Sequence, residues 1–269
     1  MPNPLRVTSV QGSFYPNSCQ KVTLLFNEFH KKFQQFNIQP NIRNIKPRMI
    51  LAPHAGYVYS GFTAYFAYQF LKQTQAKRII VIGPSHHHNF EGISGSYYEA
   101  FQTPCGNIPI DTPYLIALAK TFNISFQEKA HKKEHSTEVQ MPFIQHFFPK
   151  TKVIELIYGK VDTNELSKII IALLSNPDNL VVISSDLSHF HNLDNAKKHD
   201  NICLSSISKL DRTLLKIGCE ACGYQGIEAM IIASNYLKFS SKLLDYRTSA
   251  EYGGDTKSVV GYLSAMFYR

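Results

Sequence analysis

Three histidines follow apolar runs of the sequence at short and similar distances. They are His54 after the run at 48–53, His86 after the run at 77–84, and His189 after the run at 179–186. A neutral imidazole binds a divalent metal ion through one ring nitrogen, while a carboxylate or a carbonyl orients the other nitrogen. A single loop histidine most often makes only local hydrogen bonds, but three at equivalent positions favour one shared site. Asp186, in the same "SSDLSHFH" segment as His189, is placed to ligate the metal or to orient an imidazole.

The segment "GPSHHH" carries three consecutive histidines, and at most two of them can face one centre. Successive residues that leave a strand point in different directions. The tight Gly83-Pro84 exit fixes the residue nearest the strand most firmly, which favours His86 as the ligand. We expect His87 and His88 at the rim of the site or in solvent.

The sequence contains five cysteines. Their number is odd and their positions are scattered, unlike those of a secreted disulfide-rich protein, so we expect free thiols. They are Cys19, Cys105, Cys203, Cys219 and Cys222. Cys219 and Cys222 have CxxC spacing, which alone is weak support for a zinc site, because such sites normally need a second ligand pair. Cys222 is followed by Gly223 and then by the helix predicted at 225–237, whose start would lower the pKa of a nearby thiol and favour a metal-binding thiolate. Ordinary packing is the alternative for both, and more so for Cys219.

The segment "KKEHSTEVQMPF" (132–143) is a further polar cluster at the front of an apolar helix. Ser136 or Thr137 would cap this helix, and Glu138 would suit its positive end. Alternatively, His135 and Glu138 lie three residues apart on one helical face and reach the same site as a proton-handling pair.

The elements that must position these residues alternate between strands and helices. Four Ile- and Val-rich runs without alternation predict buried strands, and segments of helical periodicity predict the helices between them. The strands are expected at 48–53, 77–84, 152–159 and 179–186, and the helices at 61–73, 113–122, 138–148, 162–176, 194–209 and 225–237. In the helix at 61–73, aromatic residues form an apolar stripe. We also expect a hairpin or edge excursion at 101–112 and a closing strand at 258–268.

This alternation predicts an α/β fold with a mainly parallel or mixed central sheet covered by helices. Ligands of such sheets bind beyond the carboxyl ends of the strands, which is where the histidines lie.

Composition excludes several classes of protein. The 269 residues, 44% hydrophobic and 18% charged, fit a single domain over 1–269. The net charge is +8, but the basic residues are dispersed along the sequence. The most clustered basic residues lie among acidic or polar residues, in "KPR" at 46–48, "KKE" at 132–134 and "KK" at 197–198. We interpret them as solvated surface and expect no nucleic-acid partner. Neither a signal-peptide pattern nor an apolar stretch of ~18 residues is present, so we expect a cytoplasmic protein without membrane association.

Six ordered motifs give the sequence a family resemblance. They are "GSFYP", "APHAGYVYSG", "GPSH", "EHSTEVQMPF", "SSDLSHF" and "GGDTKSVVGY". In this order they resemble the Memo family, whose bacterial members are often labelled AmmeMemoRadiSam system protein B. The resemblance runs from about residue 7 to the C-terminus, and six motifs in order make it specific.

The resemblance implies a fold similar to that of the class III extradiol dioxygenases, non-haem Fe(II) enzymes that open catechol rings. It implies that His54 and His86 are metal ligands and that Cys222 stands where the dioxygenases have a carboxylate ligand. Further residues would line the same pocket, namely Asp186, His189 and His135. A thiolate is softer than a carboxylate and shifts the preference toward copper(I) or zinc. Ring cleavage therefore cannot be transferred from the fold alone.

Three functions remain open at this point. The first is a metal-dependent oxidoreductase of a small organic substrate, with Fe(II) or copper, or alternatively zinc, on the ligands just named and the pocket residues as acid–base groups. The second is a non-catalytic adaptor that binds a peptide or protein in the same pocket, and the resemblance implies companions of the radical-SAM and AMMECR types. The third is a metallohydrolase with His189 or Glu138 as base. The sequence decides neither the substrate, the metal, nor the oligomeric state.

Overall fold

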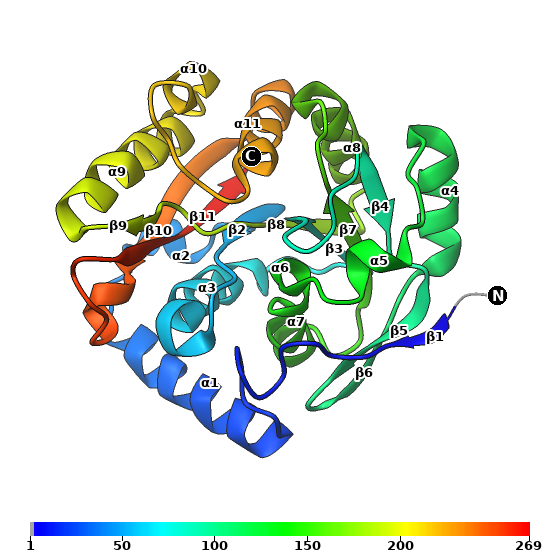
Figure 1. Cartoon of the computed structure of the whole chain (residues 1–269), viewed down its shortest axis with the longest axis horizontal. Coiled ribbons are helices and arrows are strands. Elements are labelled where there is room, and N and C mark those ends of the chain that lie inside the picture. Colours follow the sequence, from blue (N-terminus) through cyan, green and yellow to red (C-terminus); the bar gives the residue numbers. More distant parts are fainter. Residues whose placement is uncertain (1–2) are drawn as a thin grey trace.

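The structure, a computed structural model, describes residues 3–269 and has one large central sheet with helices on both faces (Figure 1). Its eight described strands are β2 (Met49–Ala52), β3 (Arg78–Pro84), β4 (Ile93–Gly95), β7 (Lys152–Tyr158), β8 (Asn179–Ser184), β9 (His189–His191), β10 (Ser240–Thr248) and β11 (Val259–Tyr268). Their order across the sheet is β10-β11-β2-β8-β3-β7-β4, and β9 pairs with β11. The predicted α/β fold is confirmed.

The middle of the sheet is parallel, because β2, β8, β3 and β7 are neighbours in that order and run in the same direction. These strands are the four apolar runs predicted from the sequence. Leu51 and Ile82 pack into the core on one face of the sheet, whereas Ile50 and Val81 pack into the core on the other. Burial on both faces explains why the runs are continuously apolar instead of alternating.

Antiparallel strands flank this parallel core, so the sheet is mixed. β4 pairs with β7 on one side, and β11 pairs with β2 on the other. The strand predicted at 258–268 is present as β11, but it lies inside the sheet because β10 covers its outer side. β10 was not predicted, since most of its residues are only partly buried and its apolar pattern is weak.

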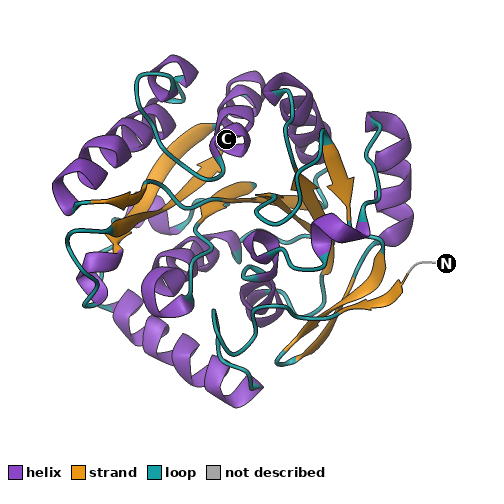
Figure 2. Ribbon diagram, viewed as in Figure 1, coloured by secondary structure: helices purple, strands orange, loops and turns teal. Residues whose placement is uncertain are grey.

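Two layers of helices cover the sheet (Figure 2). One face carries α1 (Cys19–Gln34), α3 (Tyr57–Leu71) and α7 (Met141–Phe147), and the other carries α4 (Thr112–Phe122), α8 (Thr163–Ser175), α9 (Leu193–Lys209) and α11 (Tyr224–Leu237). Shorter helices are α2 (Pro40–Arg43), α5 (Glu128–His131), α6 (His135–Glu138), α10 (Arg212–Leu215) and the 3-10 helix η1 (Ser249–Tyr252). None of the helices within residues 3–269 combines the length and the apolar composition needed to cross a bilayer.

Helix α3 differs from its predicted amphipathic form, because nearly all of its side chains are buried. The helix lies between the sheet and α1, so its outer side is covered as well. Phe62 packs edge-on against Phe29 of α1, with ring centroids 6.0 Å apart, and Phe66 packs against Phe33 at 4.8 Å.

The helix predicted at 138–148 is divided in the structure. A single turn, α6, precedes α7, which begins at Met141 with Pro142 in its first turn. Proline suits the first turn of a helix, because its missing N–H would have no partner there.

The predicted hairpin at 101–112 is present as β5 (Tyr98–Thr103) and β6 (Gly106–Pro109), which with β1 (Asn3–Arg6) form a separate three-stranded sheet. The hairpin turn is bonded to the start of α1 by a disulfide between Cys19 and Cys105. A second disulfide joins Cys203 to Cys219, and Cys222 is the free cysteine of the described chain. The expectation of free thiols is therefore wrong for four of the five cysteines, since the partners are distant in sequence and meet only in the folded chain.

Candidate metal centre

Loops from three elements bring two histidines and a cysteine together. One ring nitrogen of His54, one of His86 and Sγ of Cys222 lie within 4.8 Å of one another. Strands β2 and β3 deliver the histidines, and β8 lies between them, so the carboxyl ends of all three strands open at one edge of the sheet. The structure thus gathers the three residues that the sequence analysis selected as ligands.

The hydrogen bonds of His54 determine which ring nitrogen carries the proton. Its Nδ1 lies 3.0 Å from Oγ of Ser184. That hydroxyl donates its own proton to the carbonyl oxygen of Ser136 at 2.6 Å, so it must accept from Nδ1–H of His54. Nε2 therefore keeps its lone pair and lies 3.3 Å from Sγ of Cys222. Burial, together with the charge of His86, lowers the pKa of His54 to about 3, so the ring is neutral at neutral pH.

A buried carboxylate, Glu134, orients His86 in the same way. Its Oε1 lies 2.8 Å from Nδ1 of His86, and its Oε2 accepts the backbone N–H of the same residue at 2.5 Å. Burial acts to raise the pKa of Glu134, but the hydrogen bonds from His86 outweigh it and lower the pKa to about 2. The ionised carboxylate accepts the Nδ1 proton, which leaves Nε2 of His86 available to a metal ion.

Glu134 was not selected from the sequence, because "KKE" at 132–134 was interpreted as solvated charge. The side chain is fully buried. It also accepts the backbone N–H groups of His135 and Ser136, and it thereby caps α6, a role expected of Ser136 or Thr137. Its position directly before His135 was the available signal, since an acidic residue at the start of a helix can accept these N–H groups.

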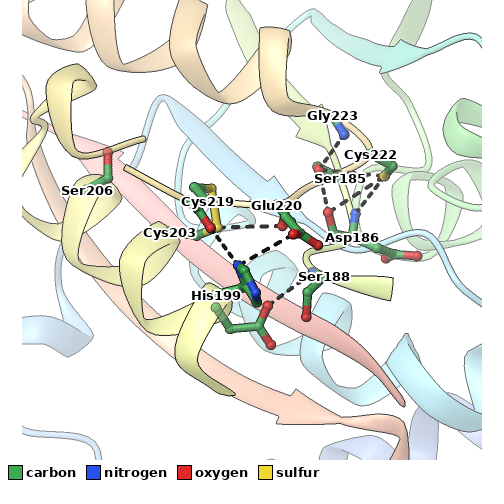
Figure 3. Close-up of a disulfide and its surroundings, with 12 residues drawn as sticks. Ser185, Asp186, Ser188, His199, Cys203, Ser206, Cys219, Glu220, Cys222 and Gly223 are labelled. Carbon is green, nitrogen blue, oxygen red and sulfur yellow. Dashed lines mark hydrogen bonds and ion pairs between the residues drawn. A yellow bond between two sulfur atoms is a disulfide. The ribbon is translucent and has the colours of Figure 1, made fainter. Parts of the chain in front are cut away.

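Cys222 lies in the loop before α11, with its sulfur next to Asp186 (Figure 3). The N–H of Asp186 donates to Sγ at 3.3 Å. Burial, reinforced by the charge of Asp186, raises the pKa of the Cys222 thiol to about 12. The expectation that the start of α11 lowers this pKa is wrong, because desolvation dominates. A cation that binds to this sulfur must displace the thiol proton.

Asp186 holds the loop that carries His54 through two hydrogen bonds. Its Oδ1 accepts the N–H of His54 at 2.8 Å and that of Ala55 at 3.3 Å. Burial raises the pKa of Asp186 against the opposing effect of these hydrogen bonds. His189, on β9, lies close enough for its charge to lower the pKa of both His54 and Asp186. Asp186 therefore contacts the cluster directly, whereas His189 acts on it only through its charge.

His135 lies at the cluster, whereas Glu138 does not. The ring centroid of His135 is 4.5 Å from that of His86 and 5.5 Å from that of His54. Burial lowers the pKa of His135 to about 4. Glu138 is fully buried elsewhere and accepts a hydrogen bond from the Arg6 guanidinium at 2.9 Å. The predicted pairing of His135 with Glu138 is wrong, because the single turn of α6 directs their side chains to different partners.

His87 and His88 take part in no metal-ligating cluster within residues 3–269. His87 is exposed, and the ring of His88 stacks on Phe90 with centroids 5.9 Å apart. His88 and Cys222 share the lining of a cleft of about 590 Å³, which also includes Phe90, Tyr158, Lys160 and Gln225. This cleft gives a ligand access to the sulfur side of the cluster.

Together, the fold and the donor set define a class of protein. It is an α/β chain with a His/His/Cys cluster beyond the carboxyl ends of the parallel strands in a mixed sheet. A family model described as "Memo-like protein" matches residues 6–266, and the chain belongs to the Memo family.

Relatives of similar length share this assignment. A MEMO1 family protein of Methanobrevibacter smithii is 31% identical over 98% of this chain and 99% of its own length. One from Sulfolobus acidocaldarius is 32% identical over the same shares, and one from Methanosarcina mazei is 34% identical over 96% and 97%. The crystal structure of an uncharacterized protein, JW3007 from Escherichia coli K12, is similar in fold, with a TM-score of 0.53, 12% identity, and coverage of 83% of this chain and 100% of that chain.

Proposed function

We propose that the chain is a metal-dependent oxidoreductase of a small organic substrate, with Fe(II) or copper bound by His54, His86 and Cys222. The observation that carries the proposal is the proton placement on the two imidazoles. Each ring donates its Nδ1–H to a buried acceptor, so each keeps its Nε2 lone pair for a metal ion, and one nitrogen of each ring lies within 4.8 Å of the sulfur.

The donor set fits such an ion. Two imidazoles and a thiolate suit iron, copper and zinc, whereas magnesium and calcium prefer oxygen ligands. Three protein ligands on one side leave coordination positions free, and the cleft beside Cys222 provides room there. When bound, the ion would supply redox chemistry at these free positions.

The chain's own residues would orient the substrate and move its protons. His135, with a pKa of about 4, is neutral at neutral pH and can accept a proton from a group bound beside His86. Lys160 supplies a positive charge at the cleft for an anionic substrate group. Asp186 and His189 would complete the acid–base groups of the pocket.

We also propose a cytoplasmic location and companions of the radical-SAM and AMMECR types, as the family resemblance implies. In a reducing cytoplasm the two disulfides would be largely open. Differential alkylation of the cysteines in freshly lysed cells tests the location, because predominantly oxidised Cys19 and Cys105 would contradict it.

The deciding experiment is metal analysis of anaerobically purified protein beside three single variants, His54→Ala, His86→Ala and Cys222→Ser. We expect stoichiometric iron or copper at this site in the wild type and its loss in each variant. His87→Ala is the matched control and should keep the metal, because its ring lies outside the cluster.

Two results would overturn the proposal. A wild type that takes up neither Fe(II), Cu(I) nor Zn(II) would favour the peptide-binding adaptor. An apolar groove of about 420 Å³, lined by Phe14, Leu24 and Val58 among others, would then be the surface to examine, since Phe14 also contacts His135. Zinc alone, with turnover that is independent of oxygen and of any electron acceptor, would favour a hydrolase.

A further inference from the structure

A second cluster of metal-ligating side chains lies outside the centre described above. His191 of β9, His199 of α9 and Glu220 of the loop before α11 each offer a ligand atom, and these atoms lie within 4.8 Å of one another. The side chains are 33%, 32% and 45% exposed, so a cation in solution can reach them. The Memo-family motifs of the sequence analysis do not contain His199 or Glu220.

In the structure, hydrogen bonds join the groups of this cluster, with the imidazoles as donors. Nε2 of His191 lies 2.7 Å from Oε2 of Glu220, and Nδ1 of His199 lies 3.5 Å from Oε1 of the same carboxylate. The carbonyl oxygen of Gly218 lies 2.9 Å from Nδ1 of His199. Around a tetrahedral zinc ion with bonds of about 2.0–2.1 Å, neighbouring ligand atoms are separated by roughly 3.3 Å. The hydrogen-bond distances of 2.7 and 2.9 Å are shorter than this separation, so a cation would replace the shared protons and spread these atoms slightly. The ligand atoms of His191, His199 and Glu220 already lie within 4.8 Å of one another.

In the oxidised protein, a covalent link holds two of the three ligands in place. Cys203 follows His199 by four residues on α9 and therefore lies on the same face of that helix. Cys219 directly precedes Glu220, and the disulfide between the two cysteines fastens the Glu220 loop to α9. Figure 3 shows this disulfide beside His199 and Glu220.

The third ligand is positioned by an unusual backbone. Phe190, between His189 and His191, has a φ of 63°, in the left-handed region that non-glycine residues rarely adopt. Its side chain is 78% exposed, so burial of the ring does not explain the conformation. The pairing of β9 with β11 also shifts register between His191 and His189. Strain of this kind is found at functional sites, where surrounding contacts hold it.

We propose that His191, His199 and Glu220 bind a second divalent cation of borderline softness, for which Zn²⁺ is the best match. Each imidazole binds through the nitrogen named above, which must first lose the proton that it donates in the structure, and the Gly218 carbonyl can complete the shell. The hard ions Mg²⁺ and Ca²⁺ are poor matches, because two of the donors are imidazoles.

The second site has a direct consequence for the main centre. Glu220 and Cys222 are two residues apart in one loop, so a cation on Glu220 holds the segment that carries the Cys222 sulfur. The site is a positioning element and requires no redox activity. Its existence is therefore independent of the proposed function.

The test uses Zn²⁺ alone on full-length protein stripped with a chelator. Stoichiometry is measured by calorimetry and by metal analysis after gel filtration. We expect two equivalents in the wild type and one in either His191→Ala or Glu220→Gln. The surface variant His30→Ala, remote from both clusters, should keep two. A Glu220→Gln variant that binds as many equivalents as the wild type would overturn the proposal, whether that number is one or two.

Binding of Co²⁺ shows separately whether the second site and the main centre each bind a metal ion. Co²⁺ bound at Cys222 gives a thiolate-to-metal charge-transfer band, whereas Co²⁺ at His191 and His199 does not. Cys222→Ser should abolish the band and keep one equivalent, and Glu220→Gln should keep the band and lose one. Loss of the band in Glu220→Gln, with the second equivalent retained, would contradict the assignment.

The disulfide is tested with the double variant Cys203→Ser, Cys219→Ser, since free thiols would themselves bind zinc. We expect the affinity of the second site to fall roughly 10-fold, as for the loss of other groups that orient ligands. An unchanged affinity would show that the disulfide does not position Glu220.

Discussion

At the scale of single residues, the candidate centre depends on hydrogen bonds that fix the imidazole protons. Ser184 and Glu134 accept from Nδ1 of His54 and His86, respectively. Neither acceptor is a ligand, and both are fully buried. Free histidines exchange their proton between two ring nitrogens, so a buried acceptor on one nitrogen prepares the other for metal binding.

Substitution of Glu134 by glutamine tests this arrangement. The amide lacks the charge and cannot accept from both the ring and the backbone of His86. We expect the affinity for Fe(II) or Zn(II) at the main centre to fall about 10–100-fold while the protein stays folded. Competition with a chromogenic chelator measures the affinity, and circular dichroism measures the fold. Glu165→Gln, an exposed acidic position on α8, is the control, and an equal loss there would contradict the argument.

Residue types and spacing were enough to select His54 and His86, because each follows a strand at the open edge of the sheet, whereas Cys222 was selected only with the help of the family resemblance. Glu134 could not be selected in the same way. Its two lysine neighbours gave it the pattern of a solvated surface, and only the packing of α6 against β3 buries it. The closeness is visible at Gly83, where an added Cβ would lie 2.6 Å from Oγ of Ser136.

At the scale of elements, a buried ion network ties β1 to the segment that carries Glu134. The Arg6 guanidinium donates to Glu138 at 2.9 Å and to the carbonyl oxygens of His131 and Glu134 at 2.6 Å each. It also lies 3.5 Å from a carboxylate oxygen of Glu155 on β7, and all of these charged side chains are almost completely buried.

Arg6→Met is expected to destabilise the fold strongly, because it leaves two buried carboxylates without their cation. Removal of one partner from a buried pair typically costs about 3–5 kcal/mol. Urea titration of wild type and variant measures the difference in the free energy of unfolding. Arg43→Met, at an exposed arginine, should change it by less than about 1 kcal/mol, and similar effects for the two variants would contradict this account.

The same network predicts how stability depends on pH. Burial acts to raise the pKa of Glu155, but Arg6 and His131 outweigh it and lower the pKa to about 2. A carboxyl with a lowered native pKa contributes stability above its unfolded pKa, and this contribution is lost as the pH falls toward the native value. We expect the wild type to lose roughly 3 kcal/mol more than Glu155→Gln between about pH 4.5 and pH 2. Urea titrations across this range test it, and parallel pH curves would exclude the role of Glu155.

Among the elements, those buried on two sides were the easiest to predict. β3 and β8 are continuously apolar because helices cover both of their faces. α1 was missed, although its buried residues Val22, Phe26 and Phe29 follow a helical spacing of four and three. Leu24, which is apolar but 55% exposed, obscured the separation into an apolar and a polar face.

At the scale of the whole molecule, the proposed centre connects distant parts of the chain. Its ligands follow β2 and β3 and precede α11, so a bound ion would link three segments directly, in addition to their hydrogen bonds through β8 and Asp186.

Metal binding should therefore raise the thermal stability of the entire fold. A ligand present at 100 times its Kd adds about 2.7 kcal/mol to the free energy of unfolding, which for a chain of this size corresponds to a Tm increase of roughly 5–10 °C. Scanning calorimetry of chelator-treated protein with and without Fe(II) or Zn(II) measures it. His87→Ala should show the full increase, and an increase of the same size in a variant that combines His54→Ala with Glu220→Gln would exclude both proposed sites as its source.

The arrangement of strands and helices could be predicted from the sequence, whereas the disulfides could not. The alternation of strands and helices along the sequence indicated the mixed α/β fold, because each element buries its own local pattern. The disulfide from Cys19 to Cys105 joins residues separated by 86 positions, and no local pattern records such proximity.

The strand order β2-β8-β3 has a consequence for the way the protein is made. The first two histidine ligands are synthesised early, but the strands that carry them are separated by β8, which begins only at Asn179. Until that strand is inserted, His54 and His86 have no fixed spacing. Cys222 emerges later still, about 7–27 s after His86 at a typical rate of about 5–20 residues per second. The nascent chain therefore has no complete centre to offer to a metal ion, and loading must wait until Cys222 has left the ribosome.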